Sequence, residues 1–382
     1  MIYFDNSATT QIYPESLKAY LDTSTKVFGN PSSLHRLGSQ AHRLLEMARG
    51  QIADLFTVQP NEIFFTSGGT EGNNWIIKGT ALAKRQFGNH IIISDIEHAS
   101  VRKAAESLQD LGLEIDYLPV DSLGIVQTEA LESLIKPTTI LVSVMAVNNE
   151  IGSIQPLEAI SEILINYPKI QFHVDAVQAV GKLSVNEYLK PRVDFLTVSA
   201  HKFHGPRGVG FIYAKSGKKL QPLLDGGGQE SAQRSTTENL AGIVAMAKAL
   251  RLSFERQAVF MDKVTKHKEL LITALTDFDK VKIFSPDTSD FIPTILTLGL
   301  PSVRGEVLVH ALEEREIFVS TTSACYSKRG KMPSTLGAMG VRQEIAEGAI
   351  RLSFGEQNTI AEVEQFMLAF RQAYIQFEKV TK

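Results

Sequence analysis

Two charged side chains with complementary chemistry, Asp175 and Lys202, each end an apolar run of the sequence. Asp175 closes the apolar part of FHVDAVQAVGK, and Lys202 lies in SAHK after the run VDFLTV. A lysine amine forms a Schiff base with an aldehyde, and a carboxylate keeps a pyridine nitrogen protonated so that the ring can accept electrons. The pair therefore predicts a site for pyridoxal 5′-phosphate (PLP). The alternative for Lys202 is a solvated charge at the end of a strand.

A glycine-rich turn in FFTSGGTEGNN (64–74) predicts an anion site. The pattern indicates a strand, a tight turn and a helix that starts near Thr70. Backbone amides at a helix start, together with the helix dipole, attract phosphate groups. Together with Asp175 and Lys202, this turn is therefore predicted to bind the cofactor phosphate. The side chains of Ser199 and His201 in SAHK could also contact the phosphate. The alternatives are a turn without a ligand and two side chains that cap a loop.

Three further side chains follow or lie within apolar runs. His98 in ISDIEHASV follows a predicted strand, where an imidazole can stack on a pyridine ring and move protons near neutral pH. Asn149 in VNNEIG can bond a ring hydroxyl or a carboxylate, although asparagine is also common in turns. Arg351 in AIRLSFG can bind a carboxylate with two parallel hydrogen bonds, or form a surface or interdomain salt bridge.

Cys325 is the only cysteine of the chain and lies in the polar stretch TTSACYSKRGKMPST. A single cysteine is more often a buried, inert side chain. Here Lys328, Arg329 and Lys331 follow closely, and nearby cations favour the reactive thiolate. We therefore interpret Cys325 as a nucleophile.

The elements that must position these residues alternate between strands and helices. Predicted strands cover 62–67, 90–95, 113–120, 138–147, 170–176, 194–200 and 209–214, and predicted helices include 98–111 and 156–166. Continuous apolar runs with helices between them are typical of a parallel sheet covered on both faces, with its ligand beyond the carboxyl ends of the strands. A long helix, or a helix pair, is predicted over 238–275. We expect a large α/β domain at 15–257, and a smaller α+β domain formed by 1–14 and 258–382 that carries the cysteine loop.

Length and composition bound the class of protein. The chain has 382 residues and a net charge of −3, so bulk electrostatics give no reason to expect a nucleic-acid partner. One cysteine excludes an intrachain disulfide and a multi-cysteine metal site, and we expect no metal. The sequence shows no signal-peptide pattern and no apolar run of the roughly 18 residues that span a bilayer. We expect a cytoplasmic protein that binds no membrane.

The sequence resembles the cysteine desulfurases of the NifS/IscS-like branch, which are class-V aminotransferases of PLP fold type I. The similarity runs over essentially the whole chain. It is carried by collinear motifs that include YFDNSATT, FTSGGTEGNN, EHASV, VNNEIG, HVDAVQAVGK, SAHKFHGPRGVGFIY, RSTTEN, STTSACYS and IRLSFG. The TTSAC segment is similar to the branch with a long cysteine loop.

The resemblance implies a role for each site residue. Lys202 would hold the PLP aldehyde, Asp175 the pyridine nitrogen and Gln178 the ring hydroxyl, while His98 would stack on the ring. The residues implied to hold the phosphate are Gly69, Thr70, Ser199, His201 and, from the second subunit of a homodimer, Thr237. Asn149 and Arg351 would bind the substrate carboxylate.

The implied reaction takes sulfur from L-cysteine, leaves L-alanine and places a persulfide on Cys325. The persulfide would then pass to an acceptor protein, either an iron–sulfur scaffold or a tRNA-thiolating enzyme. The alternatives are a selenocysteine lyase or another class-V PLP aminotransferase or lyase. The sequence departs from the family pattern at Thr236, where glycine is usual, and at Tyr326, where a small residue is common.

Overall fold

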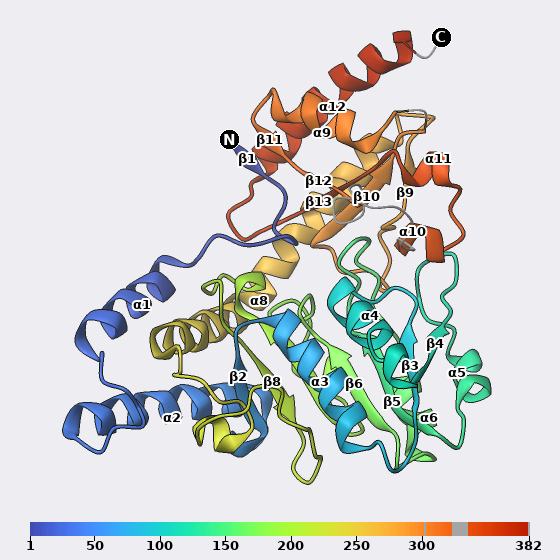
Figure 1. Ribbon diagram of the computed structural model, residues 1–382. Coiled ribbons are helices and arrows are strands. Elements are labelled where there is room, and N and C mark those ends of the chain that lie inside the picture. The colour runs from blue at the N-terminus through green and yellow to red at the C-terminus, as the bar shows by residue number, and fades with distance from the viewer. Residues whose placement is uncertain (302, 323–334, 381–382) are drawn as a thin grey trace.

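A seven-stranded sheet forms the larger part of the molecule (Figure 1). The structure is a computed structural model that describes residues 1–301, 303–322 and 335–380. In spatial order the strands are β2 (Ile63–Thr66), β8 (Gly210–Ala214), β7 (Phe195–Ser199), β6 (Gln171–Asp175), β5 (Thr139–Met145), β3 (His90–Ser94) and β4 (Glu114–Leu118). β8 runs antiparallel to both of its neighbours, β2 and β7, and all other pairs of this sheet are parallel. The seven predicted strands and the mostly parallel α/β fold are confirmed.

Helices cover both faces of this sheet, which explains why its central strands are apolar throughout. On one face α3 (Gly69–Ala83) and α4 (Ala99–Glu106) bury Ile91 and Ile93 of β3. On the other face lie α2 (Arg36–Phe56), α6 (Leu157–Ile165) and the first half of α8 (Leu240–Leu275), in one cluster with Ile92. Successive strand residues point to opposite faces, so a strand buried on both sides needs an unbroken apolar run.

A second, four-stranded antiparallel sheet lies beyond the carboxyl edge of the first (Figure 1). Its order is β12 (Ser320–Thr321), β13 (Ala349–Ser353), β10 (Ile295–Gly299) and β9 (Lys282–Ile283). Helices α9 (Gly305–Glu313) and α12 (Ile360–Val380) pack on it around a separate apolar cluster. The described part of the run EIFVSTTSA forms two short strands, β11 (Ile317–Phe318) and β12.

The N-terminal residues join this second region. β1 (Ile2–Tyr3) pairs parallel with β11, so the chain begins beside the second sheet and then returns to the first through α1 (Pro14–Lys26). The segment between β1 and α1 therefore runs between the two sheets, and it reaches the carboxyl edge of the larger one. There the Thr10 backbone amide donates to the carbonyl of His201 at 2.9 Å.

The segment predicted as a helix or a helix pair is one continuous helix, α8, of 36 residues. It begins against α1 and α2 and continues to α12, and thus links the two regions. Residue 257, the predicted domain boundary, lies inside α8, and the division into two domains stays a prediction. The remaining helices are α5 (Thr128–Leu134), α7 (Val185–Tyr188), α10 (Thr335–Ala338) and α11 (Gln343–Ala346). No helix within the described ranges has the length and apolar character to cross a membrane.

Candidate functional site

A cavity of about 420 Å³ opens at the carboxyl edge of the seven-stranded sheet. Strands that run in the same direction present their carboxyl ends on one edge, where α/β proteins bind their ligands. The predicted site residues that line the cavity are Gly69, Thr70, His98, Asn149, Asp175, Gln178, Ser199, His201, Lys202 and Arg351. The fold thus brings together residues that are spread over some 280 positions of the sequence.

Lys202 ends a short 3₁₀ turn that follows β7 directly. Its Nζ donates hydrogen bonds to the carbonyl oxygens of Ser7 at 2.5 Å and Ala8 at 2.8 Å. The lysine is therefore not a strand-end charge that points into bulk water. The N-terminal segment holds its amine at the wall of the cavity.

Asp175 is the last residue of β6 and is 5% exposed. One carboxylate oxygen accepts from Asn73 Nδ2 at 2.7 Å, and the other accepts from the Val177 amide at 3.0 Å. A carboxylate that is held by two donors at the end of a strand keeps a fixed direction. Asp175 therefore fits a cationic ring nitrogen inside the cavity.

Asn73 links Asp175 to His98 through a serine. Its second amide hydrogen reaches Ser100 Oγ at 2.8 Å, and that hydroxyl lies 2.8 Å from His98 Nδ1. The Ser100 amide also donates to Nδ1, so Nδ1 is an acceptor and the ring proton lies on Nε2. Burial in the cleft lowers the pKa of His98, opposed by the nearby Asp175 carboxylate and assisted by the Lys202 cation.

The turn before α3 forms a cradle for an anion. Gly68 has φ 147°, a conformation that favours glycine, and α3 begins at Gly69. A side chain at Gly69 would place its Cβ 3.0 Å from Val177 and 3.5 Å from Ser199. His201 lies on the same side, and burial, together with the charges of Lys202 and Arg207, lowers its pKa to about 4. Helix amides, a hydroxyl and a neutral imidazole suit a phosphate group.

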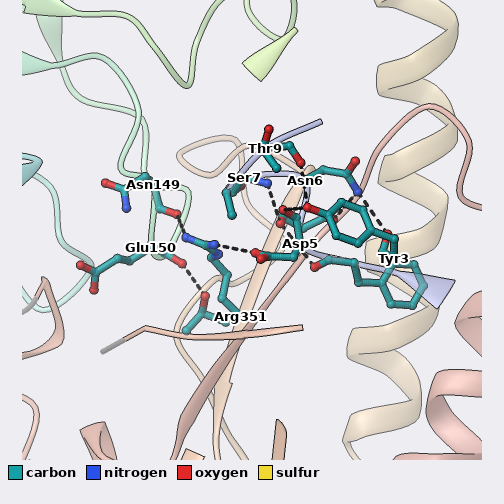
Figure 2. A network of polar contacts seen from close by, with 12 residues as sticks. Tyr3, Asp5, Asn6, Ser7, Thr9, Asn149, Glu150 and Arg351 are labelled. Carbon is teal, nitrogen blue, oxygen red and sulfur yellow. Dashed lines mark hydrogen bonds and ion pairs between the residues drawn. The ribbon is translucent and has the colours of Figure 1, made fainter. Parts of the chain in front are cut away.

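Arg351 binds a carboxylate of its own chain (Figure 2). It lies in β13 of the second sheet and is 7% exposed. One guanidinium nitrogen donates to Asp5 at 2.9 Å, and another donates to the carbonyl of Asn149 at 2.8 Å. Arg351 therefore forms a largely buried salt bridge that joins the N-terminal segment to the second sheet. Both partners fall in the predicted smaller domain, so this is not the surface or interdomain salt bridge of the alternative interpretation.

Two buried acids of the cavity wall were not singled out in the sequence. Burial raises the pKa of Glu97 to about 8 and that of Glu150 to about 7. Glu97 accepts from Ser94 Oγ and from the Met145 amide, each at 2.7 Å. The signal for Glu97 was present in the sequence, because it is an acid directly beside His98 at the end of an apolar strand.

Two predicted residues are not part of the described cavity wall. Thr237 is exposed and does not line the cavity of its own chain, and its neighbour Thr236 is only partly exposed. Cys325 and Tyr326 lie outside the residues that the structure describes.

The model of one family, Aminotransferase class-V, matches residues 2–366. The chain belongs to this family. The relatives of this class-V aminotransferase include a NifS/IcsS protein homolog of Lactobacillus delbrueckii subsp. bulgaricus, 52% identical over 100% of this chain and 99% of the relative. A cysteine desulfurase IscS of Clostridium botulinum is 41% identical over 95% of this chain and 91% of its own length.

A solved structure of a NifS-like protein supports the same assignment for the class-V fold. It superposes with a TM-score of 0.92 at 38% identity, and the match covers 98% of this chain and 99% of that one. The fold expected from the sequence resemblance is thus confirmed.

Proposed function

We propose that this protein is a PLP-dependent cysteine desulfurase. The observation that carries the proposal is the convergence of Lys202 and Asp175 on one cavity. Relatives named as cysteine desulfurases, which match nearly the whole chain, support the choice among class-V reactions.

The cavity residues fit PLP on the chemistry of their donors. Asp175 would hold the pyridine nitrogen, Lys202 the aldehyde carbon and Gln178 the ring oxygen. The residues proposed to bind the phosphate are Gly69, Thr70, Ser199 and His201, with Thr237 of the second subunit of a homodimer. Bound PLP supplies an electron sink that stabilises negative charge at the α-carbon of an amino acid.

The remaining side chains would bind L-cysteine and move its protons. Arg351 and Asn149 would hold the substrate carboxylate, and the Lys202 amine would take the α-proton. His98 faces the same space with its proton on Nε2, where it can donate a hydrogen bond to a bound ligand. The substrate carboxylate would share Arg351 with Asp5, because one guanidinium nitrogen already donates to Asp5.

Cys325 is the proposed sulfur acceptor. Its thiolate would attack the sulfur of bound L-cysteine, so that an S–S bond forms as the C–S bond breaks. The electron pair of the broken bond stays on the substrate carbon, which takes up protons and leaves as L-alanine. Thr321 and Thr322 line the cavity, and Cys325 follows them closely in the sequence. The persulfide would pass to an acceptor protein, an iron–sulfur scaffold or a tRNA-thiolating enzyme, in the cytoplasm.

Product analysis tests this proposal. The PLP-loaded protein, given L-cysteine and a thiol reductant, should form L-alanine and sulfide in equal amounts. Cys325→Ser should lose sulfide formation but still bind PLP. Formation of a keto acid instead of alanine would indicate a transaminase. A wild-type protein that acts on selenocysteine but not on L-cysteine would indicate a selenocysteine lyase.

A further inference from the structure

Lys182 lies behind the cavity wall and has no part in the proposed reaction. It belongs to HVDAVQAVGK, one helical turn after Gln178, in the segment between β6 and α7. It does not line the 420 Å³ cavity that Gln178 lines. It lines a small neighbouring cavity of about 20 Å³ instead, with Tyr13, His204 and Arg256 among its neighbours. The hydrogen bond that connects Lys182 to the wall of the larger cavity therefore goes to another side chain.

That side chain is Gln178. Lys182 Nζ donates to Gln178 Oε1 at 2.7 Å, and Gln178 Nε2 donates to the carbonyl oxygen of Ser7 at 3.0 Å. An ammonium group only donates hydrogen bonds and a peptide carbonyl only accepts them. The two neighbours therefore require the same orientation of the amide, with its oxygen toward Lys182 and its nitrogen toward Ser7 and the cavity.

This orientation decides what Gln178 offers to a ligand. One hydrogen of Nε2 is used by Ser7, and the second is left for a group in the cavity. Gln178 then presents a donor, and the ligand atom opposite it must be an acceptor. If the proposed function holds, that atom is the ring oxygen of PLP in its anionic form.

The position of Lys182 is unfavourable for a cation, because the side chain is buried. Burial lowers the pKa of Lys182 to about 7, and the charges of Lys202 and Arg351 act in the same direction. A methionine would fill similar space without this cost. The one chemical property that methionine lacks is the donor that faces Gln178.

We propose that Lys182 is a positioning residue that fixes the amide of Gln178 so that its N–H group faces the ring oxygen of the cofactor. The proposal rests on the proposed binding of PLP to this cavity. Its test therefore measures PLP binding directly, separately from any desulfurase activity.

The experiment is a double-mutant cycle on the affinity of the apo protein for PLP. Lys182→Met and Gln178→Ala should each raise the Kd roughly tenfold, the effect of one lost charge-assisted hydrogen bond. The double variant should bind no more weakly than Gln178→Ala alone, since Lys182 acts through Gln178. Lys182→Arg, which keeps a donor, should recover part of the affinity. Lys266→Met, which removes an exposed lysine of α8, should bind like wild type.

Two results would overturn the proposal while PLP binding by the wild-type protein is intact. The first is a Lys182→Met variant that binds PLP like wild type, and the second is a double variant whose loss equals the sum of the two single losses. Gln178→Glu provides a second test that leaves Lys182 in place. It keeps the contact to Lys182 but offers only acceptors to the cavity, so its affinity for PLP should fall, and an unchanged affinity would also refute the proposal. If the wild-type protein binds no PLP, the proposed function fails instead.

Discussion

The two walls of the cavity are built in different ways. One wall, the sheet wall, consists of residues that follow the carboxyl ends of β2, β3, β5, β6 and β7, and it includes Asp175, His98 and Lys202. The opposite wall, the strap wall, is formed by Ser7 and Ala8, by residues 320–322 and by Arg351 of β13, which Asp5 holds from behind. The sheet wall is aligned by one continuous parallel sheet. The strap wall depends on contacts between the two ends of the chain.

This difference is also visible in how the polar groups are satisfied. On the sheet wall, Asp175 accepts hydrogen bonds from neutral donors, Asn73 and the Val177 amide, and keeps its charge available for a cationic partner. On the strap wall, Arg351 is already paired with a carboxylate, Asp5. The comparison indicates that the carboxylate of the sheet wall keeps its charge available for a ligand, whereas the guanidinium of the strap wall already shares its charge with Asp5.

The largest effect is expected on the sheet wall. Asp175→Ala should lower kcat for L-cysteine roughly a thousandfold, because a buried charge-assisted contact to the ring nitrogen would be lost. Steady-state kinetics of the PLP-loaded variant check this. Asp116→Ala, in the middle of the edge strand β4 and outside the cavity wall, is the control and should change kcat less than twofold. If kcat of Asp175→Ala falls less than tenfold, Asp175 does not make the proposed contact to the ring nitrogen.

Two substitutions at the strap wall should change KM for L-cysteine in opposite directions. Arg351→Ala should raise KM for L-cysteine roughly thirtyfold, since the substrate carboxylate loses its cation. Asp5→Asn should instead lower KM a few-fold, because the competing carboxylate is neutralised while the side chain keeps its size. Substrate titrations of both variants measure the contrast. If Asp5→Asn raises KM as much as Arg351→Ala does, Asp5 supports substrate binding and does not compete with it.

The buried acid Glu97 of the sheet wall should make the stability of the protein depend on pH. Its carboxyl has a raised pKa in the folded protein, so the folded state holds a proton that the unfolded state releases above the ordinary glutamate pKa of about 4.3. Its contribution to stability is therefore complete below that value, and it is lost as the pH rises toward about 8. Glu97→Gln does not ionise and should become progressively more stable than wild type over this range, by a few kcal/mol at most.

Denaturant unfolding of both proteins between pH 4 and pH 9 measures this difference. Glu150→Gln is the matched variant at the other buried acid, and its stability advantage should stop growing at a lower pH, near 7. A stability difference between wild type and Glu97→Gln that is constant with pH would contradict a buried, neutral Glu97.

The smallest effect is expected at Ser100. Ser100→Ala removes the hydroxyl between Asn73 and His98 but leaves the backbone amide that also donates to His98 Nδ1. One lost neutral hydrogen bond is worth about 1 kcal/mol, so kcat should fall less than tenfold with little change in KM. Ser100→Thr keeps the hydroxyl and should retain most of the activity. A loss as large as that of Asp175→Ala would mean that the hydroxyl takes part in the chemistry.

The residues of the sheet wall could be predicted from the sequence, and the contacts of the strap wall could not. Asp175, Lys202 and His98 each end or follow an apolar strand, and a parallel sheet brings such positions to one edge, so their meeting was predictable. The salt bridge from Arg351 to Asp5 joins residues 346 positions apart, and no periodicity of the chain points to it. The same holds for the contact of Lys202 with the Ser7 carbonyl.

Helix geometry could have revealed Asn73. It follows Gly69 by four residues in α3, which places it one turn further along the same face, toward the sheet and Asp175. Lys182 was part of a motif recognised in the sequence, but its function depends on the direction of the Gln178 amide. That direction is set by Ser7, far away in the chain, and sequence spacing does not contain it.

The central claim is that the sheet wall holds PLP through Lys202, and reduction followed by peptide mapping tests it most directly. The protein is incubated with PLP, treated with borohydride to make the lysine linkage permanent, digested and analysed by mass spectrometry. The account predicts one pyridoxyl group per chain, on the peptide that contains Lys202, and its loss in Lys202→Ala. A label on a different lysine, or no label at all, would contradict it.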